Sequence, residues 1–154
     1  LSFVYTYCTD PVGCPLAYKT FVQVKDRVSA DPALRGKVRL VSLSFDPTND
    51  TPEAMTLYGG RHATDTTMPW RFLTTYSLRF LLPILEDFGQ DVELDRDADG
   101  KPMRTYTHML KVFLIDPDGN VREIYSTAFL NTQVVYNDIK TLALEASPGP
   151  GPVR

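Results

Sequence analysis

The chain has two cysteines and two histidines, and three of these four residues have the chemistry of a shared site. Cys8 and Cys14 lie in Y-C-T-D-P-V-G-C-P-L, and His108 lies in T-H-M-L-K-V-F-L-I-D-P-D-G. Two thiolates and an imidazole form a soft donor set that suits Cu(I), can also hold Cu(II), and binds zinc when a fourth ligand is present. Five residues separate the cysteines, so the pair is no C-x-x-C motif, and a redox pair or a local disulfide remains open.

The cysteine stretch connects a predicted strand to a predicted helix. Residues 1–6, L-S-F-V-Y-T, are rich in the β-branched and aromatic residues typical of buried strands. Pro15 suits the first turn of a helix, and apolar residues recur at helical spacing from Ala17 to Val28. Because a helix N-terminus lowers thiol pKa values, we expect these cysteines to be reactive.

The remaining elements alternate between strands and helices before a strand hairpin. We expect strands at 37–45, 70–73, 111–116 and 121–126, and helices at 52–59, 77–88 and about 135–146. The polar segment 91–107 is expected to be a loop or an excursion from the sheet, and Asp99-Gly100 is a candidate hairpin turn within it. This order predicts an α/β, thioredoxin-like fold with a mixed sheet flanked by helices. In that plan the loop holding His108 packs beside the cysteine loop.

Length and composition indicate one ordinary globular domain. The chain has 154 residues, 43% apolar and 23% charged, with a net charge of -3. No basic stripe is present, so we expect no nucleic-acid partner. No apolar run is long enough to cross a bilayer. Residues 1–146 form the predicted domain, and the Pro/Gly-rich residues 147–154 form a tail or linker.

Four other residues, Asp46, His62, Met103 and Met109, have side chains that could serve or adjoin such a site. Asp46, in S-F-D-P-T-N-D, is either a helix-cap and turn residue or a carboxylate that supports the site or a partner. His62 follows a Gly-Gly break in a polar stretch, and we expect it at the surface. Met109 is expected in the core, and neither Met103 nor Met109 is predicted to be a ligand.

Three blocks of the sequence resemble the Sco/SenC family. They are F-V-Y-T-Y-C…C-P, S-F-D-P-T-N-D-T-P-E and T-H-M-L-K-V-F-L-I-D-P-D-G, in the family's order and spacing, within residues 3–126. Members are thioredoxin-fold copper proteins that help to assemble the Cu(A) centre of cytochrome c oxidase. The resemblance implies that Cys8, Cys14 and His108 bind one copper ion, with Asp10 and Asp46 supporting them.

The cysteine spacing departs from that family. Its usual motif is C-x-x-x-C-P, whereas this chain has two more residues between the cysteines, including Pro11 and Gly13. Asp10 keeps the family position, two residues after the first cysteine. Copper affinity and thiol–disulfide potential depend on the loop geometry, so the longer loop can change both. The N-terminal strands usual in the family are expected to lie outside this chain.

The resemblance implies a metallochaperone that delivers copper to the Cu(A) site of cytochrome c oxidase or prepares that site. Its partners would be the oxidase subunit with the Cu(A) site and a copper donor or a thioredoxin-like reductant. The expected location is the bacterial periplasm, with a membrane anchor in the full-length protein, or the mitochondrial intermembrane space. Two alternatives stay open: a thiol–disulfide oxidoreductase that uses Cys8 and Cys14, and a metal-free redox sensor or docking module.

Overall fold

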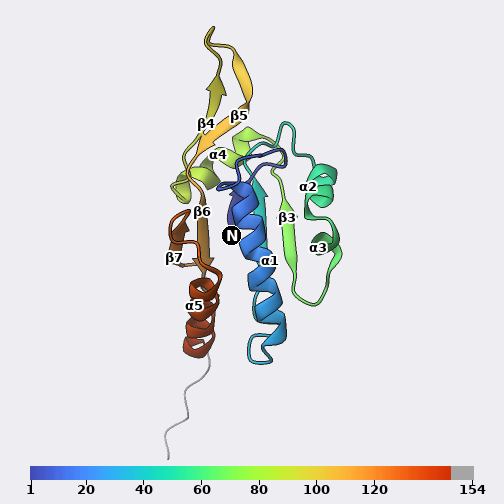
Figure 1. Cartoon of the computed structure of the whole chain (residues 1–154), viewed down its shortest axis with the longest axis vertical. Coiled ribbons are helices and arrows are strands. Elements are labelled where there is room, and N and C mark those ends of the chain that lie inside the picture. The colour runs from blue at the N-terminus through green and yellow to red at the C-terminus, as the bar shows by residue number, and fades with distance from the viewer. Residues whose placement is uncertain (147–154) are drawn as a thin grey trace, which may run out of the picture.

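The computed structural model describes residues 1–146 and contains a central mixed sheet with helices on both faces (Figure 1). The predicted tail at 147–154 lies outside the described residues. The elements in chain order are β1 (Ser2–Val4), α1 (Cys14–Ala30), β2 (Leu40–Ser44), α2 (Pro52–Gly59), α3 (Arg61–Thr64), β3 (Trp70–Leu73), α4 (Leu78–Asp87), β4 (Val92–Arg96), β5 (Pro102–His108), β6 (Lys111–Ile115), β7 (Val121–Ser126) and α5 (Thr132–Glu145).

The main sheet has the strand order β3-β2-β1-β6-β7. Strand β1 is parallel to β2, and β2 is parallel to β3, whereas β6 and β7 are antiparallel to their neighbours. The predicted mixed sheet flanked by helices is therefore confirmed. The carboxyl ends of β1, β2 and β3 meet at one edge, and the cysteine loop leaves the sheet there.

Two buried clusters hold the helices against the sheet. Helices α1 and α5 lie side by side on one face and pack Phe21, Val24 and Ile139 against strand residues such as Trp70. On the other face, Leu81 and Leu85 of α4 pack against the second cluster, which contains residues of β1, β2 and β6. Within residues 1–146, no helix combines the length and apolar character needed to cross a bilayer.

The excursion at 91–107 is a β-hairpin, as the turn residues predicted. Strands β4 and β5 pair only with each other and form a separate two-stranded sheet, which projects beyond the main sheet (Figure 1). Gly100 lies in the turn with a φ of 78°, a left-handed conformation that favours glycine. The last residue of β5 is His108, so this histidine lies at the base of the hairpin, next to the main sheet.

Two side-chain placements expected from sequence are wrong. His62 is buried, with 9% of its surface exposed, and its ring lies 5.3 Å from that of Trp70 and 6.0 Å from that of Tyr18. Aromatic partners from other elements bury it, and the polar local sequence does not reveal them. Met109 is 63% exposed, because it lies in the short connection between β5 and β6 and not in a strand that alternates into the core.

Candidate metal centre

The loop between β1 and α1 curls back on itself and holds both cysteines. The backbone N–H of Cys8 donates to the carbonyl of Tyr5, and that of Gly13 donates to the carbonyl of Asp10. Asp10 also accepts the N–H of Val12 with its carboxylate, at 3.1 Å. These turns accommodate the two additional residues between the cysteines. Cys14 then begins α1, with Pro15 in its first turn as predicted.

His108 reaches the cysteines from the hairpin. Its Nε2 atom lies 4.0 Å from the Sγ atom of Cys14. One ligand atom from each of Cys8, Cys14 and His108 lies within 4.8 Å of the other two. Cys14 is buried, whereas Cys8 and His108 are half-buried. The longer cysteine loop therefore does not separate the thiols, and the three predicted ligands converge.

Aromatic rings fix the imidazole on the side away from the solvent. The ring of His108 lies 4.8 Å from that of Phe45, directly after β2, and 6.1 Å from that of Tyr5. Tyr106, two residues earlier on β5, packs against the same two rings at 5.3 and 5.4 Å. Such edge-to-face contacts restrict ring orientation. The imidazole is therefore held toward the cysteines before any metal binds.

The pKa values of the two thiols are shifted in opposite directions. A hydrogen bond from the Cys14 thiol lowers the pKa of Cys8 to about 3, and contacts with His108 and with the backbone N–H groups of Cys14 and Asp10 act in the same direction. The same hydrogen bond and burial raise the pKa of Cys14. Both cysteines are free. At neutral pH the more exposed Cys8 is a thiolate and the buried Cys14 keeps its proton.

Asp46 is buried beside the cysteine loop and does not cap a helix. It accepts hydrogen bonds from the hydroxyl of Tyr7 and, at 2.8 Å, from the side-chain amide of Asn49. Tyr7 directly precedes Cys8, so Asp46 reaches the site through this neighbour. Asp10, by contrast, is exposed and its carboxylate closes a turn within the loop.

Sequence reasoning missed Asp50 as part of this environment. Thr51 caps α2, and Asp50 is fully buried. Its carboxylate accepts from Thr6 N at 3.0 Å, from Thr6 Oγ1 at 2.6 Å and from Ser44 Oγ at 2.6 Å. The signal was present in the same D-P-x-x-D block, whose two carboxylates both face the residues that lead into Cys8.

The donor set defines the chemistry that is possible here. Two sulfurs and one imidazole nitrogen select soft or borderline metals, and the imidazole extends the site to Cu(II). A thiolate beside a buried thiol can also attack a disulfide, so the geometry permits thiol–disulfide exchange.

Comparison with known families identifies the chain. The SCO1/SenC family profile matches residues 1–144. The chain belongs to the SCO1/SenC family. No curated protein sequence matches it.

Solved structures of Sco proteins share its fold, which is thioredoxin-like as predicted. A SCO1/SenC family lipoprotein from Bacillus anthracis is 27% identical, with a TM-score of 0.71 over 92% of this chain and 78% of that chain. ScoI from Bradyrhizobium japonicum, solved with copper bound, is 21% identical, with a TM-score of 0.66 over 92% of this chain and 82% of that chain. BsSco, described with a disulfide switch as a member of the Sco family of cytochrome c oxidase assembly proteins, is 23% identical, with a TM-score of 0.63 over 93% of this chain and 78% of that chain.

Proposed function

We propose that this protein binds one copper ion through Cys8, Cys14 and His108 and transfers it during assembly of the Cu(A) site of cytochrome c oxidase. The observation that carries the proposal is the convergence of the three ligand atoms within 4.8 Å, from segments that lie far apart in the chain. Membership of the SCO1/SenC family supports it, as does the copper-bound state of the ScoI structure from Bradyrhizobium japonicum.

Copper is the cargo of this reaction. The Cys8 thiolate is ready to bind, because its pKa is lowered to about 3, and binding displaces the remaining proton from Cys14. Transfer then proceeds by ligand exchange: each bond from copper to this protein breaks as a bond to a partner ligand forms. Copper keeps its oxidation state during that exchange. A Cys8–Cys14 disulfide has no thiolate to offer, so the oxidised protein is inactive as a carrier.

The partners and the location belong to the same proposal. The oxidase subunit that bears the Cu(A) site receives copper, and a copper donor or a thioredoxin-like reductant prepares this protein. The description of BsSco as a member of a family of cytochrome c oxidase assembly proteins supports this assignment. The lipoprotein nature of the Bacillus anthracis relative supports an extracytoplasmic location with a membrane anchor. Within that location we propose the bacterial periplasm. The alternative location is the mitochondrial intermembrane space.

Copper titration of the reduced protein tests the proposal. We expect one Cu(I) per chain, and a Cu(II) complex with thiolate-to-copper absorption. His108→Ala should abolish the Cu(II) absorption and weaken Cu(I) binding, because only two sulfurs remain. His62→Gln is the matched control, since the chain has no other histidine. Unchanged stoichiometry and Cu(II) absorption in His108→Ala would refute the three-ligand site.

A second candidate is a thiol–disulfide oxidoreductase that acts on partner cysteines. The observation that favours it is the contrast between the half-exposed Cys8 thiolate and the buried Cys14 thiol, which suits an attacking and a resolving cysteine. This activity needs no histidine ligand. Reduction of a model disulfide that survives His108→Ala but not Cys8→Ser would support it over copper transfer.

A further inference from the structure

The β4–β5 hairpin has two faces with different surroundings. Its inner face packs on the metal centre: Tyr106 contacts the rings of Tyr5 and Phe45, and the guanidinium of Arg104 lies 5.1 Å above the ring of Tyr7. On its outer face the side chains of Glu93, Met103, Thr105 and Thr107 are exposed. The inner face therefore belongs to the site already described, and the outer face is left open.

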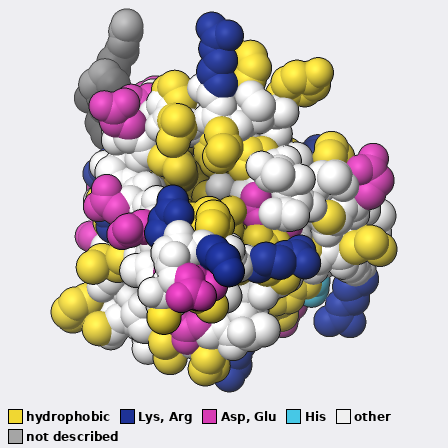
Figure 2. All heavy atoms as spheres, turned by 90° about the horizontal axis from the view of Figure 1, so that it is seen from above, with side chains coloured by type: hydrophobic (Ala, Val, Ile, Leu, Met, Phe, Trp, Pro, Cys, Tyr) yellow, Lys and Arg dark blue, Asp and Glu magenta, His cyan; other side chains and the backbone are white. Residues whose placement is uncertain are grey.

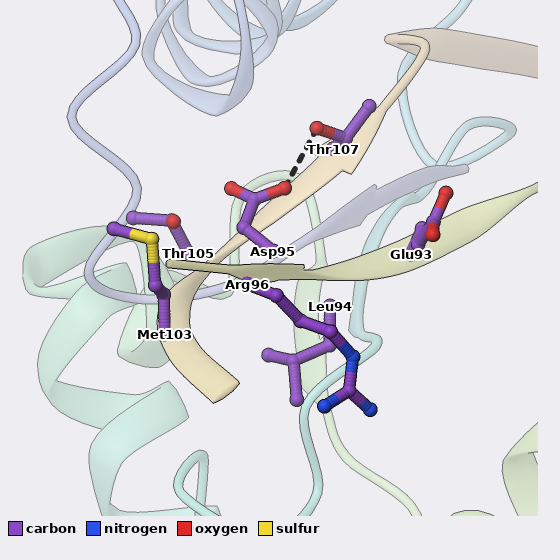
Figure 3. Close-up of a pocket in the computed structure, with 7 residues that line it drawn as sticks. All are labelled: Glu93, Leu94, Asp95, Arg96, Met103, Thr105 and Thr107. Atoms are coloured by element: carbon purple, nitrogen blue, oxygen red, sulfur yellow. Dashed lines mark hydrogen bonds between the residues drawn. The ribbon is translucent and has the colours of Figure 1, made fainter. Parts of the chain in front are cut away.

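The outer face is a hollow with a defined set of polar groups. The hollow is open to the solvent, measures about 510 Å³ and is lined by seven residues of the hairpin, of which Glu93, Asp95, Met103, Thr105 and Thr107 point to one side of the ribbon and Leu94 and Arg96 to the other (Figure 3). Asp95 accepts a hydrogen bond from the hydroxyl of Thr107 at 2.7 Å. Hydrogen bonds from Thr105 and Thr107 lower the pKa of Asp95, and they also hold its ionised carboxylate in one orientation.

These carboxylates lack a cation in the described part of the chain. Neither Glu93 nor Asp95 forms an ion pair there, and the carboxylate of Glu93 has no hydrogen-bond donor. Met103, 45% exposed, lies at the Asp95 end of the hollow, away from Glu93 (Figure 3), and can cover the aliphatic stem of a long side chain. Acidic and basic side chains are mixed over this end of the molecule (Figure 2). A partner would therefore be selected by the positions of individual polar side chains on this face, because the surface potential around it has no single sign.

The shape of the hairpin also points to a partner. Both long edges of the ribbon lack a neighbouring strand in the described structure, and a two-stranded ribbon is marginally stable by itself. An extended segment that lies along the ribbon would place alternate side chains over the hollow. Lysine or arginine side chains of that segment would meet Glu93 and Asp95, and its hydroxyls or amides would meet the threonines.

The hairpin is connected directly to the candidate ligand. His108 ends β5 and pairs with Val92, at the start of β4. The buried side-chain amide of Gln90 donates to the carbonyls of Asp91 and Met109, at 3.2 and 3.0 Å, and so ties the two ends of the hairpin together. A tilt of the ribbon about this base would move His108 relative to the cysteines.

We propose that the outer face of the β4–β5 hairpin binds an extended, basic segment of a partner protein and that this binding repositions His108. The docking part of the proposal depends only on the outer face of the hairpin and does not require copper binding. The repositioning part rests on the proposed copper function, because it assigns the partner control over one of the three ligands.

Peptide binding to the reduced, metal-free protein tests the docking part. The probe is a fluorescently labelled peptide of alternating lysine and threonine, at low ionic strength, with an alternating glutamate and threonine peptide as its counterpart. We expect saturable binding of the basic peptide only. Glu93→Gln/Asp95→Asn should weaken it roughly fivefold to tenfold, the effect of two exposed ion pairs. The matched control is Glu86→Gln/Asp87→Asn, which removes two exposed carboxylates from α4 and should leave binding unchanged.

Binding that is equal in the two double variants, or no saturable binding, would overturn the docking proposal. Amide NMR signals report the repositioning in the same samples: signals of 92–108, including His108, should shift together. Shifts that stop before His108 would overturn the coupling and leave the docking surface standing. Because neither measurement needs copper, their failure is distinct from failure of the copper titration. In copper-loaded protein, the basic peptide should also change the Cu(II) absorption.

Discussion

Replacing Asp50 by alanine should destabilise the protein and disturb the approach to Cys8. The carboxylate of Asp50 is fully buried and accepts hydrogen bonds from two donors of Thr6 and from the hydroxyl of Ser44. Thr6 lies two residues before Cys8, so this carboxylate holds the first segment of the cysteine loop against the end of β2. Alanine removes the acceptor for all three donors at once.

The magnitude follows from these three donors. A buried donor that loses its partner costs about 1–3 kcal/mol. Thr6 is half-buried, so water can replace part of what its two donors lose. We therefore expect Asp50→Ala to lower the free energy of unfolding by about 3–4 kcal/mol. Asp50→Asn keeps an acceptor oxygen and nearly the same volume, and should cost about 1–2 kcal/mol.

Urea denaturation followed by the fluorescence of Trp70 measures this loss. Trp70 is the chain's single tryptophan and is 2% exposed, so its emission reports unfolding of the core. The control is Asp118→Ala, an exposed carboxylate in the β6–β7 turn, which should cost less than about 0.5 kcal/mol. The rate of Cys8 alkylation should also change in Asp50→Ala. A loss below about 1 kcal/mol, or one equal to that of Asp118→Ala, would refute the role assigned to these hydrogen bonds.

Three further predictions concern other parts of the molecule. Because the pKa of Cys8 is lowered to about 3, its alkylation by iodoacetamide should proceed at a nearly constant rate from about pH 5 to about pH 8. Cys14→Ala removes the main hydrogen bond to this thiolate and should slow the reaction at the acid end. Burial and nearby cations lower the pKa of His62, so the folded protein resists its protonation and stability should fall as the pH drops below about 6.5. His62→Gln should flatten this dependence in urea titrations at several pH values. Gly59→Ala should destabilise the protein by about 1–2 kcal/mol, despite the better helix propensity of alanine, since its Cβ would lie 2.5 Å from the ring of Phe72.

Each of these predictions has an outcome that contradicts it. A Cys8 rate that rises tenfold per pH unit would mean an ordinary thiol. An unchanged pH slope of stability in His62→Gln would place that slope on other groups. A more stable Gly59→Ala would show that the ring of Phe72 moves aside at little cost, and the double variant with Phe72→Leu tests that relief directly.

Local patterns were sufficient for most elements of the fold. Strands β3 and β7 lie at the predicted residues 70–73 and 121–126, and α1 begins at Cys14, directly before Pro15. The hairpin turn at Asp99-Gly100 was also predicted, because glycine there permits a left-handed backbone. Such features depend on neighbours in the chain. The expected strand at 37–45 is shorter, at Leu40–Ser44, since its ends depend on pairing with β1 and β3.

The sequence by itself determined the donor types, the strand–loop–helix setting of the two cysteines, and the family to which their motifs point. Only the tertiary structure decided that the longer loop still brings Cys8 and Cys14 to His108, because loop curvature depends on hydrogen bonds such as that between Asp10 and Gly13. The burial of His62 likewise comes from rings on other elements. Contacts between segments distant in sequence set these positions, and no local pattern records them.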